Sequence, residues 1–228
     1  SNVHKRKGTN TVQISKVTGG LLEVNCYFLT EEKTGQTAVI DPGFVSESLE
    51  QEILKVGKEN ITAILLTHGH FDHITGVNHV RELTGAKVYL PQEDQAFPAN
   101  PALNLCAMMT SEPTRSFPVE RLLKDGDTIC LGDLTIQVIH TPGHTAGSCC
   151  YLVQDALFTG DTLMAGSVGR TDFPTGSYPQ ILNSMKKLYQ LPGDYRVFPG
   201  HGGNTTMQRE REENPYLRIG NSSYGFDD

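Results

Sequence analysis

Three histidines and one aspartate lie within six positions of the chain, in the stretch His68-Gly69-His70-Phe71-Asp72-His73. The whole chain has only eight histidines, so this stretch is strongly enriched in imidazole groups. Imidazole nitrogens and carboxylate oxygens are the ligands that Zn²⁺ and several other transition ions bind. A chance cluster and a solvated polar loop are the alternatives to a metal site, and the rest of the chain has to decide among them.

Four apolar runs of the sequence end in the same way, with a His or an Asp beside a glycine. The run ILLT leads to His68-Gly69-His70, IQVIHTP leads to Gly143-His144, ALFT leads to Gly160-Asp161, and YRVFP leads to Gly200-His201. Glycine allows the backbone to come close to a crowded centre. Because binding sites in sheet proteins gather at strand ends, we expect these four junctions to converge on one site.

The convergence supplies seven candidate ligands, which are His68, His70, Asp72, His73, His144, Asp161 and His201. A catalytic zinc keeps one position for water, so a single tetrahedral ion cannot use seven donors. Two ions that share a carboxylate and a water can use all of them. Such a pair lowers the pKa of the shared water and polarises a bound carbonyl. The donors therefore predict a centre of two metal ions, which the solvated-loop alternative does not explain.

The elements that must position these donors alternate between short strands and helices. Strands are predicted over residues 21–30, 37–40, 61–66, 86–90, 148–153, 156–160 and 195–198, with a hairpin that turns at Gly132-Asp133. Helices are predicted over residues 46–56, 77–83 and 177–188, where Ser46 and Ser177 suit the N-cap. Between residues 91 and 118 the periodicity fades, which fits either a mobile flap over a pocket or a long surface connection. No linker divides the chain, so we predict one domain over residues 1–228, with residues 1–10 as a flexible tail.

Charge and cysteine content limit the partners and the compartment. The net charge of −7 gives no global basic footprint for nucleic acid, and no apolar run is long enough to cross a bilayer. We therefore expect a small-molecule substrate, no nucleic acid and no membrane. The five cysteines include no Cys-x-x-Cys pair, and residues 1–7 do not resemble a signal peptide. Buried thiols in a reducing cytoplasm are favoured over disulfides, and the adjacent Cys149 and Cys150 should face opposite sides of their strand.

The motifs THGHFDH, TPGHTAGS, FTGDTL and PGHGG occur in the order found in the metallo-β-lactamase superfamily, which the chain resembles over nearly its whole length. The resemblance implies an α/β fold, an αββα sandwich of four layers, with the metals at one edge of two facing sheets. It implies that His68, His70 and His144 hold one metal, that Asp72, His73 and His201 hold the other, and that Asp161 bridges them. Asp41, in AVIDPG, matches the family's first motif and is expected to orient a ligand. A simple Asp-Pro-Gly turn is the alternative.

Two positions distinguish subfamilies within this resemblance. True β-lactamases usually have Cys or His where Asp161 stands, whereas glyoxalase II-type thioesterases, lactonases and phosphodiesterases have a carboxylate. Redox di-iron relatives usually have Glu where His70 stands. The compact, acidic chain is therefore most similar to glyoxalase II-like hydrolases.

The loop GSVGRTDFP, residues 166–174, is similar to loops of compact glyoxalase II-like hydrolases and of persulfide dioxygenases. Arg170 could steady an anionic substrate such as a glutathione carboxylate, or it could brace the loop through Asp172. Tyr178 could line the pocket or pack on its helix. Full-length glyoxalase II grips glutathione with a helical C-terminal domain, whereas only 27 residues follow His201 here.

The leading hypothesis is a binuclear zinc hydrolase of small thioesters, similar to hydroxyacylglutathione hydrolase. A hydroxide shared by the two ions attacks the thioester carbonyl, and Asp72 and Asp161 are the predicted catalytic residues. Iron, or a mixture of zinc, iron and manganese, is the alternative to two zinc ions. The alternative functions are an iron persulfide dioxygenase that uses His70, His144 and Asp161, and a lactonase or phosphodiesterase on the same centre. A metal-dependent binding protein without catalysis is disfavoured by the full set of ligands.

Overall fold

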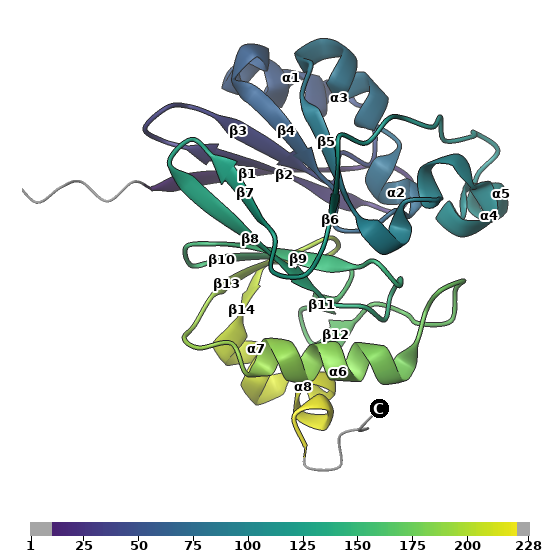
Figure 1. Ribbon diagram of the computed structural model, residues 1–228, viewed down its shortest axis with the longest axis vertical. Helices are drawn as coiled ribbons and strands as arrows, with labels where there is room; N and C mark the ends of the chain where they lie inside the picture. Colours follow the sequence, from purple (N-terminus) through teal and green to yellow (C-terminus); the bar gives the residue numbers. More distant parts are fainter. Residues whose placement is uncertain (1–10, 223–228) are drawn as a thin grey trace, which may run out of the picture.

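The apolar runs of the sequence form two six-stranded sheets that pack face to face, as Figure 1 shows for the computed structural model. The structure describes residues 11–222, so the predicted tail of residues 1–10 lies outside the described residues. The first sheet has the spatial order β1 (Val12–Gly19), β2 (Val24–Glu31), β3 (Thr37–Ile40), β4 (Ile61–Leu65), β5 (Lys87–Pro91) and β6 (Arg121–Leu123). The second has the order β14 (Thr205–Thr206), β13 (Arg196–Pro199), β10 (Ala156–Gly160), β9 (Cys149–Val153), β8 (Leu134–His140) and β7 (Thr128–Leu131). A small hairpin joins β11 (Leu163–Met164) to β12 (Ser167–Val168).

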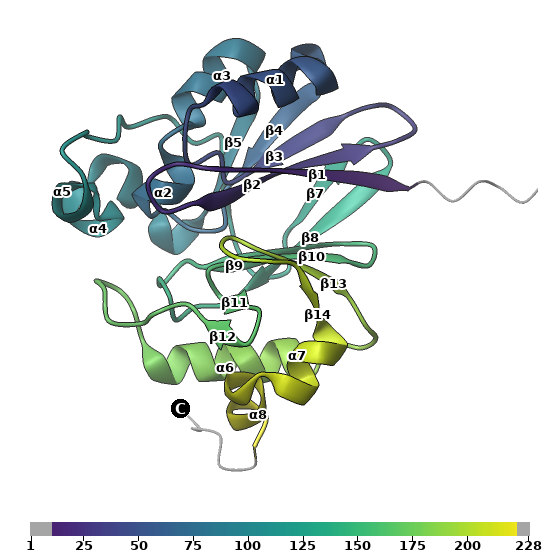
Figure 2. The same cartoon turned by 180° about the vertical axis from the view of Figure 1, so that it is seen from behind.

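Helices cover the outer face of each sheet, which is plain when Figures 1 and 2 are compared. The first sheet carries α1 (Glu47–Val56) and α3 (Val77–Thr84), and the second carries α6 (Tyr178–Tyr189), α7 (Met207–Glu213) and α8 (Pro215–Gly220). Shorter helices lie in the connections, namely α2 (Phe71–Ile74), α4 (Pro101–Asn104), α5 (Cys106–Met109) and three 3₁₀ turns (Lys58–Asn60, Gln92–Asp94 and Phe97–Ala99). The predicted N-caps are confirmed, because the side chain of Ser46 accepts a hydrogen bond from the Leu49 amide and that of Ser177 accepts one from the Gln180 amide.

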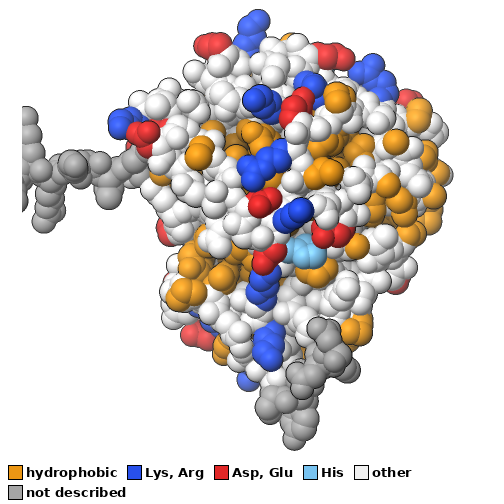
Figure 3. Space-filling view, viewed as in Figure 1, with side chains coloured by type: hydrophobic (Ala, Val, Ile, Leu, Met, Phe, Trp, Pro, Cys, Tyr) orange, Lys and Arg blue, Asp and Glu red, His pale blue; other side chains and the backbone are white. Residues whose placement is uncertain are grey.

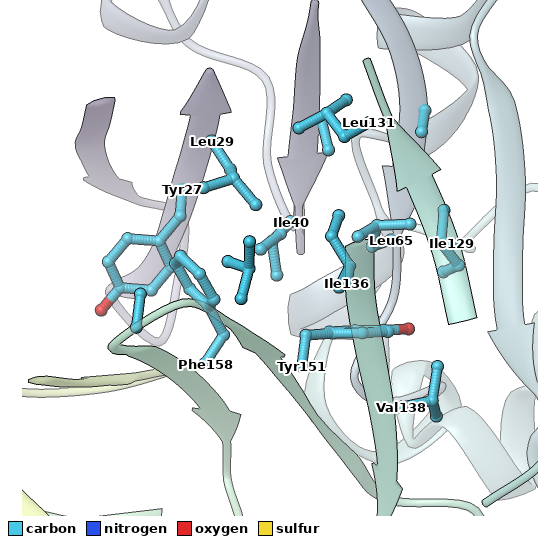
Figure 4. Close-up of a cluster of buried hydrophobic side chains, with 14 of the residues drawn as sticks. Tyr27, Leu29, Ile40, Leu65, Ile129, Leu131, Ile136, Val138, Tyr151 and Phe158 are labelled. Atoms are coloured by element: carbon cyan, nitrogen blue, oxygen red, sulfur yellow. The ribbon is translucent and has the colours of Figure 1, made fainter. Parts of the chain in front are cut away.

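Three apolar cores separate the four layers and confirm the predicted αββα sandwich. The core between the sheets includes Tyr27, Tyr151 and Phe158 (Figure 4), whose removal from water supplies much of the force that holds the sheets together. A second core lies under α1 and α3, and a third lies under α6, α7 and α8. Cys149 belongs to the core between the sheets and Cys150 to the core under the helices, as the alternation of a strand predicted.

Strand direction brings the ends of several strands to one edge of the sandwich. Strands β3 to β6 are parallel to one another, and β10 is parallel to β13. Two tyrosine hydroxyls connect the sheets near this edge: Tyr27 donates to the Pro199 carbonyl at 2.6 Å and Tyr151 donates to the Leu66 carbonyl at 2.5 Å. The loops that leave both sheets are therefore held close together.

Some predicted elements were wrong or incomplete. The strand predicted over residues 21–30 begins only at Val24, because Gly20 (φ 78°) and Glu23 (φ 53°) lie in a turn, and β1 before that turn was not predicted. Helices α7 and α8 were also missed. The aperiodic segment 91–118 contains two 3₁₀ turns as well as α4 and α5, and its movement as a flap stays a prediction.

Candidate metal centre

The structure brings all seven predicted ligands to the edge where the strand ends meet. His68 and His70 follow β4, Asp72 and His73 lie on α2, and His144, Asp161 and His201 follow β8, β10 and β13. They form two groups: a three-histidine set (His68, His70 and His144) and a mixed set (Asp72, His73, Asp161 and His201). Within each set, one ligand atom per residue lies within 4.8 Å of the others. Six of the seven side chains are buried, and His201 is partly exposed.

Asp161 lies between the two sets. Its Oδ1 is 3.2 Å from His73 Nε2, whereas its Oδ2 is 3.3 Å from His144 Nε2 and 3.4 Å from His201 Nε2. The backbone comes this close because Gly200 has no side chain: a Cβ there would lie 2.5 Å from Asp161 Oδ1. The position fits the predicted role of a carboxylate shared by two ions.

Three histidines have one ring nitrogen held by a hydrogen-bond acceptor. His73 Nδ1 lies 2.8 Å from Asp41 Oδ2, His144 Nδ1 lies 2.7 Å from the Arg170 carbonyl, and His201 Nδ1 lies 3.0 Å from the Leu22 carbonyl. An acceptor at Nδ1 keeps one proton there, so Nε2 is the lone-pair nitrogen when the ring is neutral. The rings are thus prepared to offer Nε2 to a metal ion.

Several of the buried ligand atoms face one another and have no hydrogen-bond partner. Among the described residues, the Nε2 atoms of His68 and His73 and the Oδ1 atom of Asp161 are buried without a hydrogen bond. Such atoms are destabilising unless something binds them. Two cations would satisfy these atoms and balance the carboxylates of Asp72 and Asp161, so the residues present fit a binuclear centre.

Asp41 is a buried carboxylate that holds residues of the metal centre in place through hydrogen bonds. It is buried, it directly follows β3, and its Oδ1 and Oδ2 accept hydrogen bonds from the Thr67 amide and hydroxyl at 2.8 and 2.7 Å. The same carboxylate contacts His73 of the mixed set and Thr67, which precedes His68 of the three-histidine set. It can therefore orient residues of both sets. Its φ of 54° is unusual for a residue other than glycine and costs on the order of 1–3 kcal/mol. These contacts are those expected of a residue that orients a ligand, and the Asp-Pro-Gly turn is part of the same geometry.

Asp94 is a buried residue of the site that the sequence analysis missed. Its Oδ2 accepts hydrogen bonds from the Gly69 amide at 3.0 Å and the Thr145 hydroxyl at 2.7 Å, and its Oδ1 accepts one from the Gly147 amide at 2.8 Å. The carboxylate thereby joins the loop of His68 and His70 to the loop of His144. A signal was present, because Asp94 follows the end of β5 much as the ligands follow their own strands.

The protonation of the metal-free site reflects burial and crowding. Burial, together with the charge of His144, lowers the pKa of His70 to about 3, so this ring is neutral at physiological pH. Burial alone would raise the pKa of Asp161, but the charge on His73 and the hydrogen bonds from His144 and His201 hold it well below its usual value. Burial lowers the pKa of His201, yet its bonds to Asp161 and Asp72 outweigh this effect and raise the pKa to about 10. The mixed set therefore carries protons that an incoming ion has to displace.

A pocket of about 360 Å³ opens onto both sets. It is lined by Leu22, His70, Phe71, Asp72, Leu105, Met109, His144, Asp161, Met164, Gly169, Arg170, Phe173 and His201. A larger hollow of about 460 Å³, between β1 and α1, includes none of the seven ligands. The pocket over the metal centre is therefore the candidate substrate site.

The two predicted substrate-binding residues lie differently. Arg170 lines the pocket, but its guanidinium pairs with Asp172 through two hydrogen bonds of 2.7 Å and lies 4.0 Å from the centre of the Phe173 ring. Tyr178 is the first residue of α6, is 46% exposed and is not among the residues that line the pocket. Contact of either side chain with substrate stays a prediction.

Comparison with known proteins gives the family. The model of the metallo-beta-lactamase superfamily matches residues 19–201. The chain belongs to this superfamily. Its Haemophilus influenzae relative, hydroxyacylglutathione hydrolase GloC, is 32% identical over 90% of this chain and 97% of its own length.

Two solved structures are similar over most of the chain. One is BLEG-1, a B3 metallo-beta-lactamase, with 36% identity and a TM-score of 0.82 over 90% of this chain and 99% of BLEG-1. The other is TTHA1623 in a di-iron-bound form, with 36% identity and a TM-score of 0.77 over 89% of this chain and 99% of TTHA1623. A metal-dependent hydrolase with a dinuclear centre fits both the superfamily and the ligand sets. Among the described residues, no helix is long and apolar enough to span a bilayer.

Proposed function

We propose that the protein is a binuclear metal-dependent hydrolase of small thioesters, with zinc as the metal. The observation that carries the proposal is the convergence of seven ligands in two sets, with Asp161 between them, at the floor of a pocket large enough for a small molecule. Similarity to GloC, named a hydroxyacylglutathione hydrolase, supports a thioester as the substrate. TTHA1623 was solved with two irons, so iron is the alternative metal.

The residues of the site have separable tasks in this reaction. When bound, the two ions would supply Lewis acidity and a water of lowered pKa. Asp72 is buried but lines the pocket, so its carboxylate can accept a hydrogen bond from the attacking water and orient it. Asp161 holds the two ligand sets at a fixed separation. Phe71, Leu105 and Phe173 form an apolar wall that keeps bulk water from the carbonyl.

The first test is the metal content of protein purified without added metal or chelator, measured by inductively coupled plasma mass spectrometry. We expect about two ions per chain, one for each ligand set, and mostly zinc. Hydrolysis of S-lactoylglutathione and of simple acyl thioesters should then be detected by thiol release. One iron per chain, with oxygen uptake on glutathione persulfide, would instead establish the dioxygenase alternative.

Hydrolysis of β-lactams is a second candidate function, favoured by the 36% identity to BLEG-1. A chromogenic cephalosporin in the same assay separates the two candidates. We expect a much lower kcat/KM for the cephalosporin than for thioesters, because Asp161 stands where true β-lactamases usually have Cys or His.

We also propose that the protein works in a reducing compartment such as the cytoplasm. All five cysteines are free and four of them are buried, which supports thiols that remain reduced. The test is a thiol count in denaturant on protein isolated under oxidising conditions, which should give five reactive thiols per chain.

A further inference from the structure

The walls of the metal pocket are mostly apolar. Phe71 and Leu105 are almost fully buried there, and Phe173 packs against them from the opposite loop. Met109 and Met164 complete the wall, and Figure 3 shows apolar side chains gathered on the side of the molecule where α4 and α5 lie. Methionine adapts to flexible apolar ligands and phenylalanine offers a large apolar area, so this wall suits a hydrocarbon rather than a hydroxylated group.

The pocket also lacks an unpaired fixed cation. Among its lining residues, Arg170 is the only lysine or arginine. Its guanidinium is paired with Asp172, so the two side chains together carry no net charge. Both are more than half exposed, and the pair itself contributes little stability, but it places a carboxylate beside any anion that approaches Arg170. Glutathione thioesters carry two carboxylates, which find no dedicated partner here.

A second hollow of about 180 Å³ adjoins the metal pocket and shares Leu22, Phe71 and Asp72 with it. Its other walls include Phe44 and Val45, so apolar surface continues outward from the metal centre. Glu112 also lines this hollow and disfavours a substrate that ends in an anionic group.

We propose that the preferred substrates are thioesters of apolar acyl chains, and that the thiol half needs no anionic group for recognition. This inference rests on the proposed thioesterase function and names its substrate class. The carbonyl lies at the two ligand sets, and the acyl chain extends along Phe71, Leu105 and Met109. Longer chains pass Leu22 into the second hollow, while the thiol half extends toward solvent.

The test is a chain-length series on the zinc-loaded enzyme, with acetyl, butanoyl, hexanoyl and octanoyl thioesters of the uncharged thiol N-acetylcysteamine. Full burial of each methylene corresponds to about a fourfold gain in kcat/KM, so we expect a rise of roughly twofold to fourfold per methylene up to hexanoyl. Hexanoyl glutathione should be no better than hexanoyl-N-acetylcysteamine.

A matched pair of variants tests the wall itself. Met109→Gln places an amide in the pocket. The increase in kcat/KM per added methylene should then fall to less than half of its value in the natural protein. Met108→Gln changes the neighbouring residue, which is 61% exposed and does not line the pocket, and should leave the series unchanged.

The outcomes separate the inference from the proposed function. Good hydrolysis with a flat or falling chain-length series, or a glutathione thioester at least tenfold better than its uncharged counterpart, overturns the inference and leaves the thioesterase function standing. If enzyme with two ions bound hydrolyses no thioester at all, both the proposed thioesterase function and this inference are refuted.

Discussion

The substitution Asp94→Asn isolates the carboxylate that joins the two loops of the three-histidine set. Its Oδ2 accepts bonds from the Gly69 amide and the Thr145 hydroxyl, whereas its Oδ1 accepts one bond from the Gly147 amide. An asparagine keeps the most bonds when its oxygen takes the Oδ2 position. Its NH₂ group then faces the Gly147 N–H, so one charge-assisted bond is lost and two donors oppose each other.

Two effects on stability nearly cancel in this variant. The lost bond costs about 1.5–3 kcal/mol. Burial raises the pKa of Asp94 from 3.8 to about 6, which means that the folded metal-free chain holds this charge at neutral pH at a cost of about 3 kcal/mol. The neutral amide removes that cost, so we expect the free energy of unfolding at pH 7 to change by less than about 2 kcal/mol. Because the pKa of Asp94 is raised in the folded chain, the natural protein loses free energy of unfolding as the pH rises from 4 to 6. The asparagine variant does not share this loss, so its free energy of unfolding relative to the natural protein should be higher above pH 6 than below pH 4.

Metal affinity has no such compensation. The opposed donors displace the loop that carries His144, and loss of a residue that supports ligands typically reduces affinity 10-fold to 100-fold. Zinc titration against a competing chelator in a His201→Ala background measures this, because that background removes a ligand of the mixed set only. Asp155→Asn is the control, since Asp155 is exposed and lies at the other end of β10 from Asp161. Unchanged affinity, or an unfolding free energy reduced by more than about 3 kcal/mol, would show that Asp94 serves the fold and not the metal.

Three further predictions concern the same site. Asp41→Asn should lower the affinity for both ions 10-fold to 100-fold, measured by competition with a chelator, because Asp41 contacts His73 and the residue before His68. A lower affinity for one ion alone contradicts this. Since the pKa of His201 is raised to about 10 and that of His73 is also raised, protons must leave both rings when metal binds, so zinc affinity at the mixed set should rise at least tenfold per pH unit from pH 6 to pH 8; an affinity independent of pH would refute this. Asp172→Asn leaves Arg170 unpaired and should improve kcat/KM for glutathione thioesters roughly threefold over uncharged ones; no change would mean that the pair does not govern charge selection.

The sequence was sufficient to predict which seven side chains come together at the site, because their signal is local. Each follows an apolar run and lies beside a glycine, and the spacing within residues 68–73 is itself diagnostic. The layers could be predicted for a similar reason: β4 and β10 are short, mostly apolar runs, and α1 and α6 have capped, amphipathic patterns. In these elements the local pattern and the tertiary environment largely agree.

The elements that were missed have weak local signals. Strand β1 lies at an edge and is only partly buried, so polar residues interrupt its alternation. Helix α7 has the sequence MQREREE and buries only Met207 and Glu210, which leaves no apolar stripe to detect. The orientations of Arg170 and Tyr178 depend on loops and helices distant in sequence, and no spacing rule specifies them. Asp94 was missed because its partners lie 25 and more residues away along the chain.

The positions of Asp41 and Asp94 explain how the centre is connected to the fold. Both follow strands of the first sheet, but Asp41 contacts mainly residues of that sheet's own loops, whereas Asp94 also bonds to the loop that follows β8 of the second sheet. The ligand sets have the same character, because each set draws residues from both sheets. Ions bound there cross-link the two halves of the sandwich and neutralise carboxylates whose burial is otherwise destabilising. Metal binding should therefore contribute to the stability of the fold as well as to catalysis, so variants that weaken the ions will lower the melting temperature of the metal-loaded protein more than that of the metal-free chain.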